Sequence, residues 1–311
     1  MHFEQLDLNL LVALDALLTD RSITAAGMRV HLTQSAMSGA LSRLREFFND
    51  DLLTQVGRRM VPTPLGESLA EPVRQILLQI KATINAKPGF DPATSTRHFS
   101  VMMSDYVDTV LMSEVLRRAE DIAPWVRFNL MSNDVTSPVE LLERADVDLM
   151  IMPRQYLSDK HPHEDLYTDD YACVVWRDNP LIGSSISVDQ YLQMGHVVLQ
   201  FGGGRVPVQD EWFLTKLGVT RRIEVRAMNF NSVPQHIVGS RRIATIHRRL
   251  AEYYARCLPL KILAPPYDLP SLTEAVQWHR LFEADSGNLW LRGLLKQVAA
   301  EVHAHGEAAR P

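Results

Sequence analysis

The pattern of apolar and polar positions divides the chain into two parts with different periods. Up to about residue 87, apolar residues recur at helical spacing, which predicts amphipathic helices. From residue 97 onward, short apolar runs alternate with helical segments, which predicts strands of a parallel sheet joined by helices. A chain of 311 residues is long enough for two or three domains.

Residues 33–48 show the sharpest division into two helix faces. The apolar face consists of Met37, Leu41, Leu44 and Phe48. The opposite face consists of Gln34, Ser35, Ser38, Ser42 and Arg45. Small hydroxyl and amide side chains let a helix lie close to a partner and form hydrogen bonds with it, and Thr33 can cap the first free amides. We therefore interpret this segment as a helix that enters the major groove of DNA.

Two neighbouring segments predict a winged helix-turn-helix around this helix. An apolar helix is expected over 6–18, and Ser22 can cap a second helix over 23–30. Residues 52–56 and 60–61 predict short strands, and the turn between them carries Arg58 and Arg59, which can reach phosphates or the minor groove. The alternatives are an ordinary three-helix core and a solvated charged loop, because spacing does not separate these from a DNA-binding head.

A long helix is expected next, with Thr63 as its N-cap and Pro64 as its first residue. An apolar seam with steps of four and three residues runs along it and predicts pairing of two copies. Pro72 lies inside this helix and should kink or loosen it locally. The alternative is that the seam packs on its own domain. The seam consists of Leu69, Val73, Ile76, Ile80 and Ile84.

The second part of the chain predicts two similar α/β lobes after a hinge over 88–96. In lobe I, strands at 99–103, 126–130 and 147–152 alternate with helices at 107–123 and 138–145. In lobe II, strands at 196–201, 222–227 and 243–247 alternate with helices at 208–217, 233–238 and 248–257. A strand or pair of strands at 166–176, a strand at 273–278 and a helix at 289–302 complete the set. These elements divide the chain into a DNA-binding head at 1–62, a linker helix at 63–87, lobe I at 97–170 with 265–311, and lobe II at 171–264.

A small-molecule site is expected between the lobes, beyond the carboxyl ends of the strands. Its candidate residues combine apolar and aromatic side chains with a few polar groups. Asp169 and Asp170 favour a strand-edge pair over an acid/base dyad, and plain core packing is an equal alternative for Leu111 and Phe230. The candidates are Ser104, Tyr106, Leu111, Asn133, Asp169, Phe201, Phe230 and His247.

The net charge of the chain gives little support to DNA binding. The chain has a net charge of −5 and a pI of about 6.1, so its bulk charge does not favour polyanions. The first 65 residues contain six basic and seven acidic residues, a net charge of −1. DNA binding would therefore depend on the distribution of charge, since four of the arginines follow residue 42 and four of the acids precede residue 21.

Known catalytic and metal motifs are absent from the sequence. It contains no GxSxG, HExxH or GxxxxGK[ST] pattern, and residues 202–204 are three glycines without phosphate-loop spacing. Two histidine pairs, at 161 and 163 and at 303 and 305, have no further ligands at suitable spacing. Cys173 and Cys257 form no CxxC pair, and no signal peptide or membrane span is evident. We expect a cytoplasmic protein without metal, cofactor or catalytic residues.

Several segments carry a family likeness. L-D-L-N-L-L-V-A-L-D-A-L-L, S-I-T-A-A, L-T-Q-S-A-M-S-G-A-L-S-R-L-R and G-R-R-M-V-P-T-P resemble the N-terminus of LysR-type transcriptional regulators. S-T-R-H-F-S-V-M-M-S-D, F-G-G-G-R, R-R-I-E-V and T-E-A-V-Q-W resemble the branch of the nodulation regulators and the regulators of aromatic, nitroaromatic and chlorinated-aromatic catabolism. The likeness covers the whole chain. It implies a winged helix-turn-helix, a linker-helix dimer, a periplasmic-binding-protein-like effector domain and tetramers assembled from dimers.

The resemblance also implies which residues read DNA. Gln34 and Ser38 match base-reading positions, whereas Ser35 stands where the family usually has Pro, Gly39 where other branches often have Arg, and Gln55 where many members have Arg. We expect DNA contacts from Ser22, Thr33, Gln34, Ser35, Ser38, Arg43, Arg45, Arg58 and Arg59.

The leading hypothesis is a ligand-responsive transcription activator and not an enzyme. Its expected partners are double-stranded operator DNA, an aromatic or phenolic inducer and further copies of the chain in a homodimer or homotetramer, with RNA polymerase as another candidate. The alternative is a small-molecule-binding or catabolic enzyme with a fused helical head. DNA affinity that falls steeply with salt would favour the regulator, and turnover without DNA binding would favour the enzyme.

Overall fold

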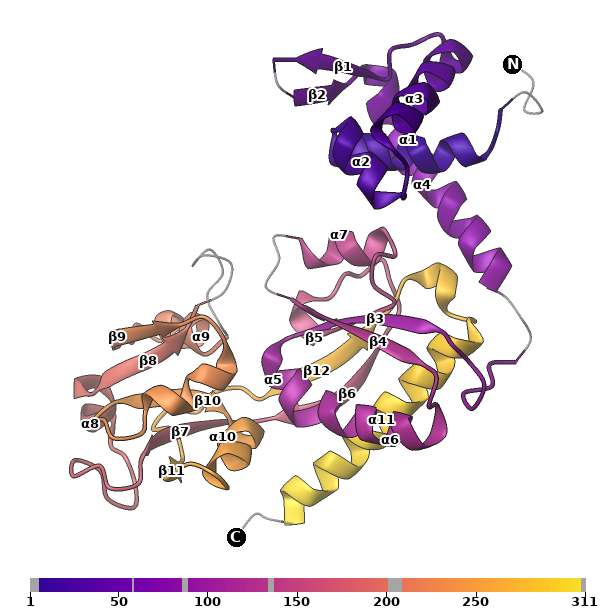
Figure 1. The fold of residues 1–311 in the computed structure, drawn as a ribbon. Helices are drawn as coiled ribbons and strands as arrows, with labels where there is room; N and C mark the ends of the chain where they lie inside the picture. The colour runs from indigo at the N-terminus through magenta and orange to yellow at the C-terminus, as the bar shows by residue number, and fades with distance from the viewer. Residues whose placement is uncertain (1–5, 58, 86–88, 134–136, 201–208, 309–311) are drawn as a thin grey trace. The chain divides into compact units, whose positions relative to one another are not determined.

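A computed structural model describes residues 6–57, 59–85, 89–133, 137–200 and 209–308 of the chain (Figure 1). These residues divide into two compact units, at 1–86 and 87–311. The first unit contains helices and one small hairpin, and the second contains two five-stranded sheets with their helices. This mixture confirms the predicted fold class.

The first unit is the expected winged helix-turn-helix. Helices α1 (Asn9–Asp20), α2 (Ile23–Arg29) and α3 (Gln34–Phe48) precede an antiparallel hairpin of β1 (Leu53–Val56) and β2 (Arg59–Pro62). The long helix α4 (Pro64–Asn85) follows and is continuous through Pro72. All three predicted caps are confirmed. Ser22 Oγ accepts the N–H of Ala25 and Thr33 Oγ1 accepts the N–H of Ala36. At the start of α4, Thr63 Oγ1 accepts the N–H of Gly66. Helix α1 begins later than predicted, and Asp7 Oδ1 accepts the N–H of Asn9 at its start.

The apolar face of α3 packs as its pattern predicts. Met37, Leu41 and Leu44 are buried in one core with the leucines of α1. Helix α4 begins close to this core, because a Cβ on Gly66 would lie 2.2 Å from the carbonyl oxygen of Leu52. A glycine at position 66 is therefore what lets α4 pass directly over the start of the hairpin.

Lobe I of the second unit is built on the sheet β4-β3-β5-β12-β6. Strands β3 (His98–Met103), β4 (Arg127–Ser132) and β5 (Leu149–Pro153) are parallel and are connected by α5 (Asp105–Val107), η2 (Asp108–Met112), α6 (Ser113–Ile122) and α7 (Pro138–Glu143). This confirms the predicted βαβαβ order, with one difference: η2 is a π-helical turn inside the helical segment. Strands β6 (His163–Asp169) and β12 (Leu272–Gln277) pair antiparallel, and α11 (Ser286–Ala308) lies beside α6 (Figure 1).

Lobe II is built on the sheet β11-β7-β10-β8-β9. Its strands are β7 (Tyr171–Trp176), β8 (Gly195–Leu199), β9 (Arg222–Ala227), β10 (Ile243–His247) and β11 (Leu260–Leu263). Its α-helices are α8 (Val188–Gln193), α9 (Gln209–Lys216) and α10 (Arg248–Ala255). The chain enters this lobe at Asp170, between β6 and β7, and leaves it between β11 and β12.

One local prediction for lobe II was wrong, and one strand was missed. The helix expected over 233–238 is two 3₁₀ turns, η5 (Phe230–Ser232) and η6 (Pro234–His236), because Pro234 removes an amide donor and Gly239 takes a positive φ of 71° soon afterwards. Strand β11 was not predicted, since it is only four residues long and shows no alternation of apolar and polar positions.

The close approach at Gly66 leads to a stability prediction. Replacing Gly66 by Ala should lower the free energy of unfolding by about 1–3 kcal/mol, because the new Cβ overlaps a backbone oxygen that cannot rotate away. Gly39→Ala is the matched control, since no described atom beyond its chain neighbours and the adjacent helix backbone lies within 4 Å of its added Cβ, and alanine favours the helix by about 1 kcal/mol. Denaturant unfolding of both variants measures the difference, and equal stabilities would contradict the packing argument.

Candidate functional site

The polar face of α3 is accessible from Gln34 to Ser42. Gln34, Ser35, Ser38 and Arg43 are exposed, and the hydroxyl oxygens of Thr33 and Ser35 lie 3.1 Å apart. Ser22 and Thr33 use their side-chain oxygens as helix caps, so their first role is to fix the starts of α2 and α3. The structure therefore presents a short hydroxyl and amide surface at the N-terminal end of α3.

The arginines of the head have different surroundings. Arg45 was predicted to contact DNA, but its guanidinium donates to the carbonyl oxygens of Asp51 (2.8 Å) and Leu53 (2.6 Å). Those two bonds hold the end of α3 to the first strand of the hairpin, so Arg45 is a positioning residue. Arg43 stays accessible, with its side chain 62% exposed and a loose 4.0 Å approach to Asp7.

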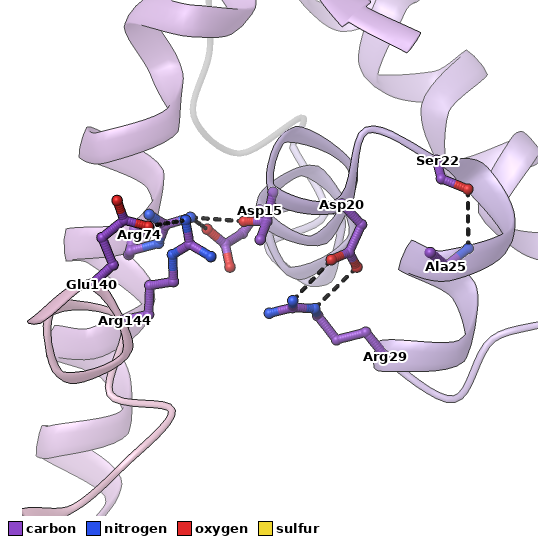
Figure 2. A network of polar contacts seen from close by, with 9 residues as sticks. Asp15, Asp20, Ser22, Ala25, Arg29, Arg74, Glu140 and Arg144 are labelled. Atoms are coloured by element: carbon purple, nitrogen blue, oxygen red, sulfur yellow. Dashed lines mark hydrogen bonds and ion pairs between the residues drawn. The ribbon is translucent and has the colours of Figure 1, made fainter. Parts of the chain in front are cut away.

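Figure 2 shows a second constraint on the arginines. Arg29 donates two hydrogen bonds to the carboxylate of Asp20, and Arg74 of α4 donates to Asp15 and Thr19 of α1. Arg59 lies exposed at the start of β2, whereas Arg58 lies outside the described residues. Arg43 and Arg59 therefore remain as the accessible cations of the predicted DNA-binding set.

The predicted seam of α4 has two parts in the structure. Val73 is buried and Leu69 half-buried against the core of the head, so these two residues pack on their own domain instead of a partner. Ile76, Ile80 and Ile84 are 48%, 37% and 68% exposed. Together with Gln79 and Thr83 they line an open apolar groove of about 290 Å³.

Four of the predicted effector residues meet where the two lobes touch. Tyr106 of lobe I donates a 2.7 Å hydrogen bond to Asp169, the last residue of β6. The Tyr106 ring lies with its centroid 4.2 Å from that of His247 and 5.7 Å from that of Phe230, both in lobe II. All four side chains are buried. Ser104 is close in sequence and caps α5, where its Oγ accepts the N–H of Val107.

The other three predicted effector residues are not part of this cluster. Leu111 is fully buried in the core shared by the helices of lobe I, so the packing alternative holds for it. Asn133 is half-buried beyond β4, and its N–H donates to the carbonyl oxygen of Met103. Phe201 and the three glycines after it lie outside the described residues.

Sequence reasoning missed several residues of this region. A cavity of about 10 Å³, close to the space of one water molecule, lies behind Phe230 and His247. Its wall also includes Tyr171, Asp210 and Thr245, and Asp210 is held by a 2.8 Å hydrogen bond from Arg221. Tyr171 could have been found from its place directly after the crossing at Asp169 and Asp170. Asp210 could not, because its partner Arg221 is eleven residues away, in the connection before β9, and no spacing pattern links the two.

Burial shifts the ionisable groups at the contact. It raises the pKa of Asp169 to about 6, although Tyr106 and Arg249 oppose this shift. Burial, followed by the charge of Asp169, raises the pKa of Glu274 on β12 to about 8. The pKa of His247 falls to about 3, so its ring is neutral near pH 7. The expected Asp169–Asp170 edge pair is thus one buried and one partly accessible carboxyl, with Asp170 accepting from Ser271.

The described residues contain no group of three or more His, Cys, Asp or Glu side chains that could hold a metal ion. Among the same residues, no helix has the length and apolar character that a membrane span requires. A winged helix-turn-helix followed by a domain of two α/β lobes is an arrangement typical of a class of proteins, the bacterial transcription regulators.

Comparison with known proteins identifies the family. Residues 8–67 match the bacterial regulatory helix-turn-helix protein model of the lysR family, and residues 93–300 match the LysR substrate binding domain. The chain belongs to the LysR family of transcriptional regulators, and it is not an enzyme. The alternative of a catabolic enzyme with a fused head is therefore wrong.

Individual relatives support this assignment. Nodulation protein D 1 of a Bradyrhizobium species is 43% identical over 310 residues, covering 100% of this chain and 98% of that protein. Nodulation protein D 2 of Rhizobium tropici is 43% identical over 302 residues, 96% of this chain and 95% of that protein. The crystal structure of a probable transcriptional regulator from Pseudomonas aeruginosa is similar with a TM-score of 0.65 and 26% identity, covering 94% of this chain and 98% of that one.

The buried carboxyl of Glu274 leads to a pH prediction. The folded chain keeps its proton to about pH 8, whereas the unfolded chain releases it near 4.5, so the free energy of unfolding falls as the pH rises through that interval. Glu274→Gln should flatten this fall by up to about 1.4 kcal/mol per pH unit, because the amide has no proton to release. Denaturant unfolding between pH 5 and 8 measures the slope. The exposed Glu120→Gln is the control, and identical slopes for all three proteins would contradict the prediction.

Proposed function

We propose that this LysR-type regulator is a cytoplasmic transcription activator whose inducer is a small aromatic or phenolic molecule bound between lobes I and II. The observation that carries the proposal is the aromatic cluster of Tyr106, Phe230, His247 and Tyr171, with Asp169 as a hydrogen-bond acceptor in its midst. Rings stack on rings, and buried polar groups fix orientation. The similarity to nodulation protein D supports assignment to that branch of the family.

The neutral state of His247 supports an uncharged inducer. A ring with a pKa near 3 carries no charge at pH 7 and can exchange hydrogen bonds with a hydroxyl group. Among the residues that the structure describes, its Nδ1 has no hydrogen-bond partner, and its side chain is buried and lines the cavity. Ser104, Asn133 and Phe201 complete the proposed effector set, whereas Leu111 belongs to the buried core that also contains Tyr106.

For DNA, we propose that Gln34, Ser35 and Ser38 read bases in the major groove, and that Arg43 and Arg59 contact phosphates. The exposed hydroxyl and amide groups on the first turns of α3 support base reading. Ser22 and Thr33 hold the helix starts, and Arg45 holds the hairpin whose turn carries Arg58. We assign 1–62 to DNA binding, 63–87 to dimerisation, 88–96 to a hinge, and the two lobes to effector binding.

Footprinting on the intergenic DNA beside its gene, with and without aromatic compounds, tests the function. We expect a protected region that changes when the right compound is present, and an affinity that falls steeply with salt. Calorimetry on the full-length protein with phenols, aromatic acids and flavonoids tests the effector class. Binding of an amino acid or a sugar, with no heat from any aromatic compound, would refute that class.

Ser35 gives a prediction about operator preference. Ser35→Pro should leave the fold intact, because the residue lies in the first turn of α3, where a proline breaks no helical hydrogen bond. It removes the hydroxyl beside Thr33 and should change the ranking of operator variants, by about 1–3 kcal/mol for an affected base pair. Gel shifts over an operator series measure the ranking, and an unchanged ranking would show that Ser35 reads no base.

The apolar groove on α4 is our proposed dimer seam, with two such dimers forming a tetramer. Ile80→Asp should shift the chain toward monomers and weaken operator binding, because a charge would replace an apolar contact between copies. Leu289→Asp, at an apolar residue of α11 that is 50% exposed, is the control. Sedimentation measures the oligomeric state, and a monomer fraction equal to that of the control would contradict the seam.

A further inference from the structure

We propose that Asp105, Thr109 and Asn231 form an autoinhibitory latch between lobes I and II, which must open before the effector can bind. This inference rests on the proposed effector site between the lobes. It assigns these three residues a positioning role, since they hold one wall of the site in place. The residues come from the start of the helical segment after β3 and from the turn η5 after β9.

The latch is a compact set of hydrogen bonds across the lobe contact. The carboxylate of Asp105 accepts the backbone N–H groups of Phe230 (3.1 Å) and Asn231 (2.8 Å). The side-chain amide of Asn231 donates back to the carbonyl oxygen of Asp105 (3.2 Å) and to Thr109 Oγ1 (2.9 Å). Because one side chain accepts two backbone N–H groups and its partner donates two bonds in return, the two lobes are held here by four hydrogen bonds.

The latch fixes an aromatic wall residue. Phe230 is the first residue of η5, so the bond to its own N–H holds its ring against Tyr106 and His247. With the turn in this position, the cavity behind these rings has about 10 Å³, whereas pockets for small molecules measure about 300–1,000 Å³. An aromatic effector therefore needs Phe230 to move away from Tyr106, and that movement breaks the bonds to Asp105.

The helical irregularity of lobe I lies at the same place. Asp105 begins α5, and Thr109 belongs to the π-helical turn η2, a feature that often occurs at functional sites. Thr109 Oγ1 also lies 2.9 Å from the carbonyl oxygen of Asp105, so the two latch residues of lobe I are within hydrogen-bond distance of each other. The three residues therefore release or engage the turn η5 as one unit.

The charges of the two lobes favour the latched state. Residues 97–170 and 265–311 contain eleven basic and twenty-one acidic residues, a net charge of −10. Residues 171–264 contain twelve basic and six acidic residues, a net charge of +6. The lobes therefore attract each other, and salt screens this attraction beyond about 8–10 Å. Opening of the latch should become more frequent as the salt concentration rises.

Hydrogen exchange on the full-length protein without effector tests the latch directly. Asp105→Asn and Asn231→Ala should each speed exchange of the Phe230 and Asn231 backbone amides about tenfold or more. The first variant weakens the acceptor of these two amides. The second removes the side-chain bonds that hold the turn η5 to lobe I. Exchange in β3 and β10 should stay unchanged, which excludes general unfolding. Asp121→Asn, an exposed carboxylate at the end of α6, is the matched control. Exchange of the two amides at the control rate in both variants would overturn the latch.

The autoinhibitory role is tested by the sign of a binding change. With 1-naphthol as the probe, the Asp105→Asn variant should bind the compound about tenfold more tightly than the unmodified protein does, since the variant no longer has to break the latch. A residue that contacts the effector would give weaker binding instead, and equal or weaker binding would overturn autoinhibition. If 1-naphthol binds to none of the proteins, 1-naphthol is excluded as an effector, the aromatic panel decides the effector class, and the exchange result alone decides the latch.

Discussion

The contact between Tyr106 and Asp169 is the constraint on which the effector domain depends. Asp169 ends the strand that carries the chain out of lobe I, and Tyr106 begins the helical segment after β3, so their bond joins the two ends of lobe I that face lobe II. His247 and Phe230 complete the contact from lobe II. Because both groups of the bond are buried, separating the lobes would expose a carboxyl and a phenol to water, whereas the bond between them lies within lobe I and would remain.

The first 65 residues carry a net charge of −1, so the overall charge of the head does not attract it to DNA. Three arginines bind acidic side chains or carbonyl oxygens within the head: Arg29, Arg45 and Arg74. Two others, Arg43 and Arg59, are accessible to solvent. Among the described residues of the predicted DNA-contacting set, these two arginines are the accessible cations, and a pair of heads would hold phosphates more firmly than one head. The exposed isoleucines of α4 are suited to hold two copies together.

The periodic elements of the chain could be predicted, and the partners of individual side chains could not. The stripe of α3 is set by steps of three and four residues, and the structure buries Met37, Leu41 and Leu44 as that pattern requires. Arg45 shares the period of the exposed face, but its fork reaches two carbonyl oxygens that only the following turn brings near. Leu69 and Val73 have the same helical spacing as Ile80. They are covered by the core of the head and Ile80 is not, a difference that the spacing does not reveal.

The sequence by itself determined the family, the order of the elements and the polar face of α3, because these are properties of local spacing. Only the tertiary structure decided which candidates meet. It brought Tyr106, Asp169, Phe230 and His247 together from four elements, placed Leu111 in the core, and joined Asp105 to Asn231 across 126 positions. The physical reason is that hydrogen bonds and ring contacts act over a few ångströms in space, whereas the distance along the chain carries no trace of them.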